Sequence, residues 1–296
     1  MFLLVGGDSE IGAATSAFLA AQGRPVSSTT RRSDRAADGR PWLDLAAPLD
    51  AWEPPAATRS ACIFAAMARL AACAADPAGT ARINVTQTLA LIERLLARGI
   101  HVLFLSTNQV FDGNIPQTPA DALACPVSEY GRQKAWVEAA VREHIQGGAP
   151  AAILRLSKVV SRGMPLIGDW MAALSTGKEI RAFHDMTLAP VPTDMVSAAV
   201  GALMQDGARG VYQLTGPRDV SYAEVGRFVA RHLDAGPSLV SEISALEAGL
   251  PEGATPQHTT LDSSLLRDRY GIDVPDVWQV IEGAMAAAKE RVHARE

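Results

Sequence analysis

A tyrosine and a lysine four residues apart, Tyr130 and Lys134 in the segment SEYGRQKA (128–135), could act together as a proton-donating device. On a helix this spacing puts both side chains on one face. An unperturbed tyrosine titrates near 10, so bringing its pKa toward 7 requires about 4 kcal/mol of preferential phenolate stabilisation, which a close ammonium in a partly dry site can supply. The spacing also arises as an ordinary pair of helical neighbours: with 4 tyrosines in the chain, about 5% of shuffled sequences would contain it.

The position of this pair in the chain favours the chemical interpretation. The segment IHVLFLST (100–107) predicts a strand that ends in Ser106 and Thr107, and the predicted helix 128–146 then carries the pair. In an open parallel sheet, the ligand crevice lies at the carboxyl ends of the strands. A hydroxyl at that end and the Tyr–Lys pair can therefore converge on one reacting group, although capping of the strand end is the commoner role for a lone Ser or Thr.

Short apolar runs alternate with amphipathic stretches along the first half of the chain. The predicted strands are 2–6, 24–30, 61–68, 100–107 and 151–157, and the predicted helices are 11–23, 78–98 and 128–146. This alternation requires crossover connections, so it predicts a Rossmann-type, doubly wound α/β fold with a mostly parallel sheet covered on both faces.

After residue 160 the pattern loosens, with helices expected near 221–234, 262–270 and 275–292. No long linker separates the two halves. We therefore predict a Rossmann domain over residues 1–160 and a smaller substrate-binding lobe over residues 161–296, with some segments of the lobe returning to the main sheet.

The turn between the first predicted strand and helix has the composition of a phosphate-binding loop. In VGGDSEIG (5–12), Gly6, Ser9 and Gly12 occupy the three positions of a Gly-x-x-Gly-x-x-Gly pattern. Backbone N–H groups here, at the helix N-terminus that includes Glu10 and Ile11, can hold a pyrophosphate. Ser9 replaces the middle glycine: its Cβ takes up room, but its hydroxyl can donate to a phosphate. A Gly-rich turn that merely connects two elements looks the same.

The end of the second predicted strand bears on the choice of dinucleotide. The segment STTRR (28–32) places Arg31 and Arg32 where proteins that prefer NAD carry an acidic residue for the ribose 2'-hydroxyl. Guanidinium groups suit the 2'-phosphate of NADP instead, although solvated arginines are common on any surface. The sequence therefore predicts that the Rossmann domain over residues 1–160 binds NADP(H) in preference to NAD(H).

Composition argues against several other classes of protein. The net charge is -5 over 296 residues, and lysines and arginines are scattered, which argues against nucleic acid as the main partner. The opening apolar run is too short for a signal peptide or a membrane span, so we expect a cytoplasmic protein with no membrane partner. Cys62, Cys73 and Cys125 lie far apart without a Cys-x-x-Cys spacing, so we predict neither a disulfide framework nor a metal site.

Seven short segments spread over nearly the whole chain carry a family likeness: LVGGDSEIG, WLDLAAP, INVTQTLAL, LFLSTNQVFDG, YGRQK, ILRLSKV and PTDM. In kind and order they resemble the extended short-chain dehydrogenases/reductases, and within that family the dTDP-4-dehydrorhamnose reductase group. The resemblance implies an NADPH-dependent reductase of a nucleotide-linked 4-keto-6-deoxysugar. By position it makes Thr107 the residue that hydrogen-bonds the substrate carbonyl and Tyr130 the general acid. Lys134 would lower the pKa of Tyr130 and bind the nicotinamide ribose.

The same resemblance implies a set of residues around the cofactor. Asp44 and Leu45 would flank the adenine, and Ala65, Ala66 and Met67 would line the cofactor. The full predicted set also contains Gly6, Ser9, Glu10, Ile11, Gly12, Arg31, Arg32, Ser106, Tyr130 and Lys134. Thr107 and Asn108 would contact the substrate.

The chain departs from the family pattern directly after Thr107, where Asn108 and Gln109 replace Asp-Tyr. Related 4,6-dehydratases carry Asp-Glu there, so the absence of both carboxylates argues against dehydration and leaves reduction. Two alternatives stay open: a non-catalytic regulatory subunit that binds NADP and a nucleotide sugar, and a sugar-nucleotide epimerase that holds NAD tightly.

Two further features of the sequence leave questions open. The helices at 78–98 and 128–146 have apolar faces that suit a homodimer, although packing against the sheet explains much of the same pattern. In the C-terminal half, four residues are candidates for the rim of the crevice, although each is more often a surface or packing residue: Arg162, Trp170, His184 and Arg218.

Overall fold

A six-stranded parallel sheet organises the protein. The computed structural model describes residues 1–161, 164–250 and 255–293. The strands of this sheet are β1 (Phe2–Val5), β2 (Val26–Ser28), β3 (Ser60–Ile63), β4 (His101–Thr107), β5 (Ala151–Leu156) and β10 (Gly210–Leu214). Their order is β10-β5-β4-β3-β1-β2, so the chain builds outward from β1 to β2 and then crosses back to β3. The predicted Rossmann-type α/β fold is confirmed.

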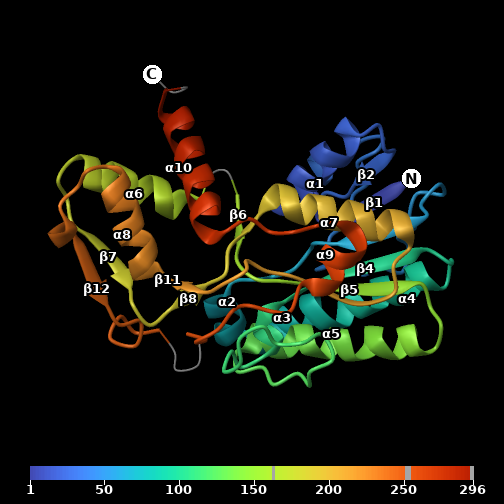
Figure 1. Cartoon of the computed structure of the whole chain (residues 1–296). Helices are drawn as coiled ribbons and strands as arrows, with labels where there is room; N and C mark the ends of the chain where they lie inside the picture. Colours follow the sequence, from blue (N-terminus) through green and yellow to red (C-terminus); the bar gives the residue numbers. More distant parts are fainter. Residues whose placement is uncertain (162–163, 251–254, 294–296) are drawn as a thin grey trace.

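Helices cover both faces of this sheet (Figure 1). On one face lie α1 (Glu10–Ala21), α7 (Thr193–Asp206) and α9 (Ser264–Tyr270), and on the other lie α4 (Thr88–Leu96) and α5 (Glu129–Gln146). Successive side chains of a strand point to opposite faces, so Leu3 and Leu4 of β1 enter different cores. Leu4 packs with Leu19 of α1, whereas Leu3 packs with Leu91 of α4. Strands buried on both sides therefore appear in the sequence as unbroken apolar runs.

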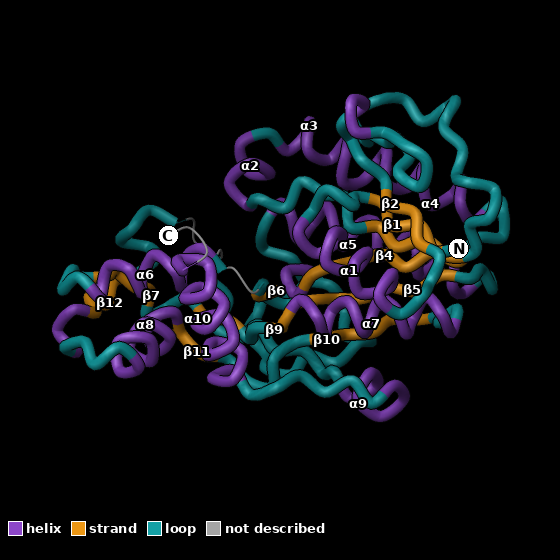
Figure 2. The backbone as a smooth tube through the Cα atoms, turned by 90° about the horizontal axis from the view of Figure 1, so that it is seen from above, coloured by secondary structure: helices purple, strands orange, loops and turns teal. Residues whose placement is uncertain are grey.

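A smaller lobe, with a core of its own, follows the carboxyl end of β5 (Figure 2). It contains α6 (Pro165–Ser175), β7 (Ile180–Phe183), α8 (Tyr222–His232), β12 (Val240–Ile243) and α10 (Val277–His293). Ile167, Val229 and Ile281 are fully buried in its core. Three two-stranded sheets belong to this half: β7 with β12, β8 (Thr187–Leu188) with β11 (Val220–Ser221), and β6 (Val159–Val160) with β9 (Val191–Pro192).

Segments from the second half of the chain lie in or on the main sheet. α7, β10 and α9 all pack in or on it. The assignment of cofactor binding to residues 1–160 and of substrate binding to residues 161–296 stays a prediction.

The long helix predicted over residues 78–98 is divided in the structure. It consists of α3 (Pro77–Ala81), a π-helical segment η2 (Arg82–Gln87) and α4, and the short α2 (Leu70–Ala75) precedes it. Single π-helical turns inside α-helices often mark functional sites, because the wider turn redirects a side chain. Here the wider turn contains the buried Asn84. Short 3-10 turns complete the elements: η1 (Ser33–Arg35), η3 (Asn108–Val110) and η4 (Pro237–Leu239).

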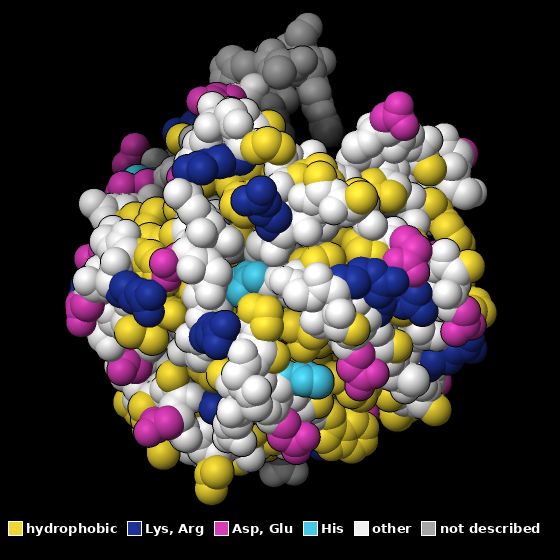
Figure 3. All heavy atoms as spheres, turned by 90° about the vertical axis from the view of Figure 1, so that its right-hand side faces the viewer, with side chains coloured by type: hydrophobic (Ala, Val, Ile, Leu, Met, Phe, Trp, Pro, Cys, Tyr) yellow, Lys and Arg dark blue, Asp and Glu magenta, His cyan; other side chains and the backbone are white. Residues whose placement is uncertain are grey.

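The surface shows no concentration of basic charge on the face drawn in Figure 3. Lysine and arginine side chains there lie in small groups among acidic and apolar ones. Within residues 1–161, 164–250 and 255–293, no helix is long and apolar enough to cross a membrane.

Candidate active site

The end of β4 carries two hydroxyl groups, as the sequence predicts. Thr107 is buried, and its Oγ1 accepts a hydrogen bond from the Gln109 N–H (3.2 Å) and lies 3.4 Å from the Asn108 Oδ1. The hydroxyl of Ser106 is buried without a hydrogen-bond partner in the described part of the chain. A buried hydroxyl left unpaired is unfavourable, so it fits a polar group that a bound ligand would bring.

Helix α5 begins directly on the loop that follows β4. Ser128 is its N-cap: the Ser128 Oγ accepts from the Gly131 N–H (3.0 Å) and donates to the Gln109 Oε1 (2.8 Å). A Cβ on Gly131 would lie 2.1 Å from the Gln109 carbonyl oxygen, so only glycine permits this approach. The contact places the first turn of α5, which contains Tyr130, against the end of β4.

Lys134 reaches the same strand end. Its Nζ donates to the Leu105 carbonyl oxygen at 2.7 Å and lies 4.3 Å from the centre of the Phe104 ring. Burial lowers the pKa of Lys134 to about 8, and the negative charge of Glu138 opposes this shift only in part. Lys134 is therefore an ammonium held in a dry site against the backbone of β4.

The electrostatics of Tyr130 differ from the sequence prediction. Burial raises the pKa of this phenol above its ordinary value of 10.0, whereas the sequence predicts a lowered pKa. The physical reason is distance: the Lys134 Nζ lies 6.0 Å from the centre of the Tyr130 ring and is hydrogen-bonded to β4. No residue of the described chain hydrogen-bonds the Tyr130 hydroxyl, so it is free to bind a ligand.

One turn after Lys134, Glu138 forms a buried ion pair with Arg155 of β5. Both Arg155 Nε and Nη2 donate to the carboxylate, with Nη2 at 2.7 Å from Oε2, and the two side chains are 1% and 3% exposed. The remaining Nη1 donates to the Gln213 Oε1 at 3.0 Å. A bidentate pair with additional hydrogen bonds fixes the orientation of both groups. This cluster joins α5 to β5 and β10 directly behind Lys134.

The Gly-rich turn has the shape of a phosphate cradle. Gly6 has a φ of 93°, a conformation that favours glycine, and a Cβ on Gly12 would lie 2.5 Å from the Gly6 carbonyl oxygen. Ser9 is the N-cap of α1, where it accepts from the Gly12 N–H and donates to the Gly6 carbonyl oxygen (2.8 Å). Its hydroxyl therefore closes the turn, instead of pointing outward to a phosphate.

Glu10 and Ile11 form the first turn of α1, whose N–H groups have no acceptor within the helix. The side chain of Glu10 lines a groove of about 810 Å³ between α1, α7 and α10. Tight glycine packing, a free helix N-terminus and the unpaired Ser106 hydroxyl together fit a dinucleotide across the carboxyl ends of the strands.

The residues predicted for the adenosine end lie at the edge of the sheet beside β2. Arg31 and Arg32 are exposed, and neither guanidinium pairs with a carboxylate of the described chain. Asp44 is half-buried and caps the Ala46 N–H at 2.9 Å, while the Leu45 side chain is buried in the core. The sequence prediction missed a carboxylate here: Asp8 of the Gly-rich turn binds the end of β2.

The segment Ala65, Ala66 and Met67 follows β3, and the side chain of Asn84 holds its backbone in place by hydrogen bonds. The Asn84 side chain accepts from the Met67 N–H (2.8 Å) and donates to the Met67 carbonyl oxygen (2.9 Å) and to the Gln133 Oε1 (2.7 Å). Asn84 stands outside the predicted site, and its role is to fix the backbone of a predicted cofactor-lining segment to α5. Its place in the π-helical turn was not visible in the sequence.

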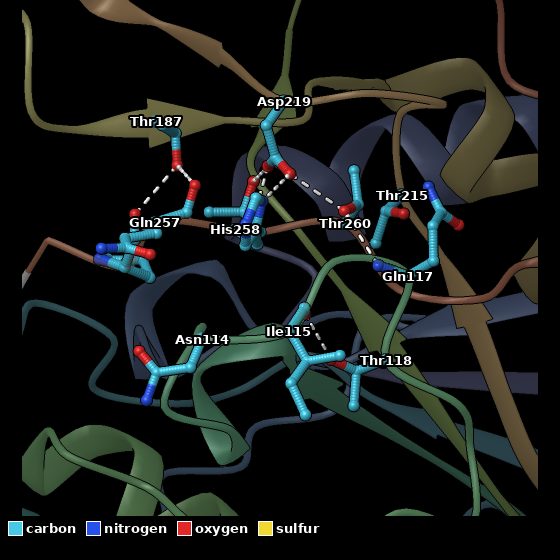
Figure 4. Close-up of polar contacts among 12 residues, drawn as sticks. Asn114, Ile115, Gln117, Thr118, Thr187, Thr215, Asp219, Gln257, His258 and Thr260 are labelled. Atoms are coloured by element: carbon cyan, nitrogen blue, oxygen red, sulfur yellow. Dashed lines mark hydrogen bonds and ion pairs between the residues drawn. The ribbon is translucent and has the colours of Figure 1, made fainter.

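A polar network centred on Asp219 fastens the second half of the chain to the loop after β4 (Figure 4). The Asp219 carboxylate accepts from the Thr260 Oγ1 (2.9 Å) and the Thr259 N–H (2.6 Å) and contacts the His258 Nδ1 (3.3 Å). The Thr260 hydroxyl in turn accepts from the Gln117 N–H at 3.1 Å. This network fixes the wall of a narrow groove beside the catalytic candidates, which is lined by Asn108, Gln109, Phe111, Asp112, Gly113, Val127 and Pro256.

The C-terminal rim candidates have ordinary structural roles where they are described. Trp170 packs in the core of the lobe, His184 is exposed, and Arg218 pairs with Asp276 at 3.1 Å. Arg162 lies outside the described residues. Within the described ranges, no cluster of three or more His, Cys, Asp or Glu side chains is arranged to hold a metal ion.

Comparison with known proteins identifies relatives over most of the chain. The model of the RmlD substrate binding domain matches residues 1–289. The dTDP-4-dehydrorhamnose reductase of Sinorhizobium fredii is 29% identical over 217 residues, which cover 69% of this chain and 71% of that protein. Among solved structures, MoeE5 in complex with UDP-glucose and NAD has a TM-score of 0.81 at 20% identity and covers 98% of this chain and 99% of that one. The dTDP-4-dehydrorhamnose reductase of Bacillus anthracis, in complex with NADP, has a TM-score of 0.76 at 16% identity, with 98% of each chain covered.

The likeness to these two solved structures shows a shared fold, and the family match adds the class of chemistry. The chain is an extended short-chain dehydrogenase/reductase, that is, an NAD(P)-dependent reductase. Within that class it belongs to the RmlD substrate binding domain family, whose members resemble dTDP-4-dehydrorhamnose reductase. The family prediction made from the sequence is confirmed.

Proposed function

We propose that this protein reduces the 4-keto group of a nucleotide-linked 6-deoxysugar with NADPH. The observation that supports the proposal is the close packing of α5, which carries Tyr130 and Lys134, against the end of β4, which carries Thr107. A hydroxyl that can bind a carbonyl oxygen, a phenol with no protein partner and a buried ammonium are the groups that carbonyl reduction requires.

Each residue has a separate task in this proposal. The reduced nicotinamide, when bound, supplies the hydride that adds to the keto carbon. The Thr107 hydroxyl donates a hydrogen bond to the keto oxygen, and Tyr130 gives its proton to that oxygen as negative charge develops on it. Lys134 then stabilises the phenolate that remains, and this requires its Nζ to leave the Leu105 carbonyl or to share its protons with it.

The preference for NADPH rests on charge at the adenosine end. Arg31 and Arg32 are exposed beside the end of β2 and have no carboxylate partner in the described chain. Guanidinium groups in that position attract a 2'-phosphate.

The direct test measures NADPH oxidation with a panel of 4-keto nucleotide sugars, alongside binding of the cofactor by calorimetry. Wild-type protein should oxidise NADPH with at least one member of the panel. Tyr130→Phe should bind NADPH nearly as well but lose roughly 10² to 10⁴-fold in turnover, the usual contribution of a positioned acid. Unchanged turnover in Tyr130→Phe would remove the mechanism.

The same experiment separates the two other functions that the sequence leaves open. Binding of cofactor and sugar without oxidation across the whole panel would indicate a regulatory binding module. NAD that remains with the protein through purification, together with 4-epimerisation of the sugar, would indicate an epimerase.

A further inference from the structure

The carboxylate of Asp8 lies in a ready-made anion site at the end of β2. Its Oδ2 accepts from the Thr30 hydroxyl (2.8 Å) and the Arg31 N–H (3.2 Å), and its Oδ1 accepts from the Arg40 Nη2 (2.6 Å). Thr30 is completely buried, and the Asp8 side chain is 23% exposed. An acidic side chain from the Gly-rich turn therefore reaches the strand end where the sequence predicts only arginines.

The partners of Asp8 are those that bind a phosphate monoester. A hydroxyl, a backbone N–H and a guanidinium are the usual donors to phosphate oxygens. The Arg40 guanidinium can also donate a further hydrogen bond, because its Nε is buried without a hydrogen-bond partner in the described chain. Burial acts to raise the pKa of Asp8, but the hydrogen bonds from Thr30, Arg40 and the Arg31 N–H together lower it below its ordinary value. The Asp8 side chain is therefore a carboxylate anion at neutral pH.

The location of this anion site indicates which part of a dinucleotide it would face. In a doubly wound sheet, the dinucleotide crosses the carboxyl ends of the strands next to the first Gly-rich turn. The end of the second strand then faces the ribose of the adenosine half, where a carboxylate accepts the 2'-hydroxyl of NAD or an arginine binds the 2'-phosphate of NADP. Asp8 and Arg40 bring both kinds of group to one place.

We propose that Asp8 is a specificity-determining residue for the dinucleotide, because its carboxylate occupies the place of the 2'-phosphate. NADP(H) binds only when Asp8 releases Thr30, the Arg31 N–H and Arg40 to the phosphate, whereas NAD(H) binds with Asp8 in place. The arginines thus favour binding of NADP(H), whereas Asp8 opposes it. Asp8 therefore reduces the ratio of the affinity for NADPH to the affinity for NADH. This inference rests on the proposed function only in that the chain must bind a dinucleotide.

The test compares direct binding of four probes to the cofactor-free full chain by calorimetry: NADP⁺, NAD⁺, adenosine 2',5'-bisphosphate and 5'-AMP. The variants are Asp8→Asn, which keeps the size of the side chain and removes its charge, and Arg40→Met. Asp34→Asn is the matched control, because Asp34 is an exposed carboxylate of η1 near the same strand end and makes no contact with Arg40. It removes the same charge but leaves the anion site intact.

Asp8→Asn should raise the affinity for NADP⁺ and the bisphosphate by about tenfold, while the affinities for NAD⁺ and 5'-AMP change by less than about threefold. Arg40→Met should lower the affinity for the two 2'-phosphorylated probes by about tenfold, and Asp34→Asn should leave all ratios of affinity unchanged.

If Asp8→Asn does not fold, the Arg40→Met result decides: an equal loss of affinity for all four probes overturns the inference. An unchanged NADP⁺ to NAD⁺ ratio in folded Asp8→Asn also overturns it, while the dinucleotide function stands. Failure of the wild type to bind any probe instead removes the proposed function itself, and the inference with it.

Discussion

Replacement of Lys134 by Met should make the cofactor-free protein more stable and nearly inactive. A pKa of about 8 in place of the ordinary 10.5 corresponds to about 3 kcal/mol of stability lost to the buried charge, at about 1.4 kcal/mol per pKa unit. Methionine keeps the linear chain against Phe104 but removes the 2.7 Å hydrogen bond to the Leu105 carbonyl, which is worth about 1 kcal/mol. The net expected gain at pH 7 is about 2 kcal/mol.

The pH dependence of this gain identifies its cause. Below pH 8 the lysine is charged in both the folded and the unfolded chain, so the wild type bears the full penalty. Between about pH 8 and pH 10.5 the unfolded chain holds the proton that the folded chain has lost, so wild-type stability rises with pH. The advantage of Lys134→Met is therefore largest at pH 7 and shrinks toward pH 10.5.

Urea unfolding of cofactor-free wild type and Lys134→Met, at pH 7 and at about pH 9.5, measures both quantities. Lys178→Met is the matched control, because Lys178 is exposed, and its stability should stay within about 0.5 kcal/mol of the wild type at both values of pH. A Lys134→Met protein that is less stable than the wild type at pH 7, or whose advantage is the same at both values of pH, would refute the idea of a buried charge held at a free-energy penalty.

Three further substitutions test the supports of the site. Gly131→Ala puts a Cβ 2.1 Å from the Gln109 carbonyl oxygen, so it should lose about 1 to 3 kcal/mol in urea unfolding and lower kcat more than cofactor affinity; wild-type kcat would contradict this. Glu138→Gln leaves Arg155 buried without its counter-charge and should lose about 3 to 5 kcal/mol, a loss that the double variant with Met at both positions should largely recover. Ser106→Ala removes an unpaired hydroxyl, so cofactor-free stability should hold or rise by about 1 kcal/mol while calorimetry shows weaker dinucleotide binding; unchanged affinity would exclude Ser106 from the cofactor site.

The strands of the main sheet could be predicted because their burial leaves a local trace. The FLLV run of β1 is apolar at successive positions because Leu3 and Leu4 enter cores on opposite faces. The helices of the second half leave a weaker trace. α7 packs against both the sheet and its neighbour α1, with Gly201 closely packed on Leu19, so its buried residues extend over more than one side and the one-sided pattern is lost.

Parts of the candidate site that depend on residue type and order along the chain could be predicted from the sequence, whereas contacts across the fold could not. Thr107 ends β4, and Tyr130 and Lys134 lie on α5, the next α-helix, so the order of strand and helix is enough to propose them as one set. Asp8 and Asn84, by contrast, act through partners 22 and 17 residues away. These contacts join different elements of the fold, so the helical and strand periodicities of the sequence do not predict them.

The departure at Asn108 and Gln109 has a structural explanation that bears on turnover. The Gln109 side chain accepts from Ser128 at 2.8 Å, and its backbone carbonyl lies where a Cβ of Gly131 would be. Both contacts of Gln109 hold the first turn of α5 against the end of β4. Tyr130 lies on that turn, and Thr107 lies at that strand end. In the proposed mechanism, a residue that fixes Tyr130 relative to Thr107 supports reduction. Asn108 lines the neighbouring groove. If the sugar binds there as proposed, Asn108 is the residue of this pair at which a substitution should alter contacts to the sugar.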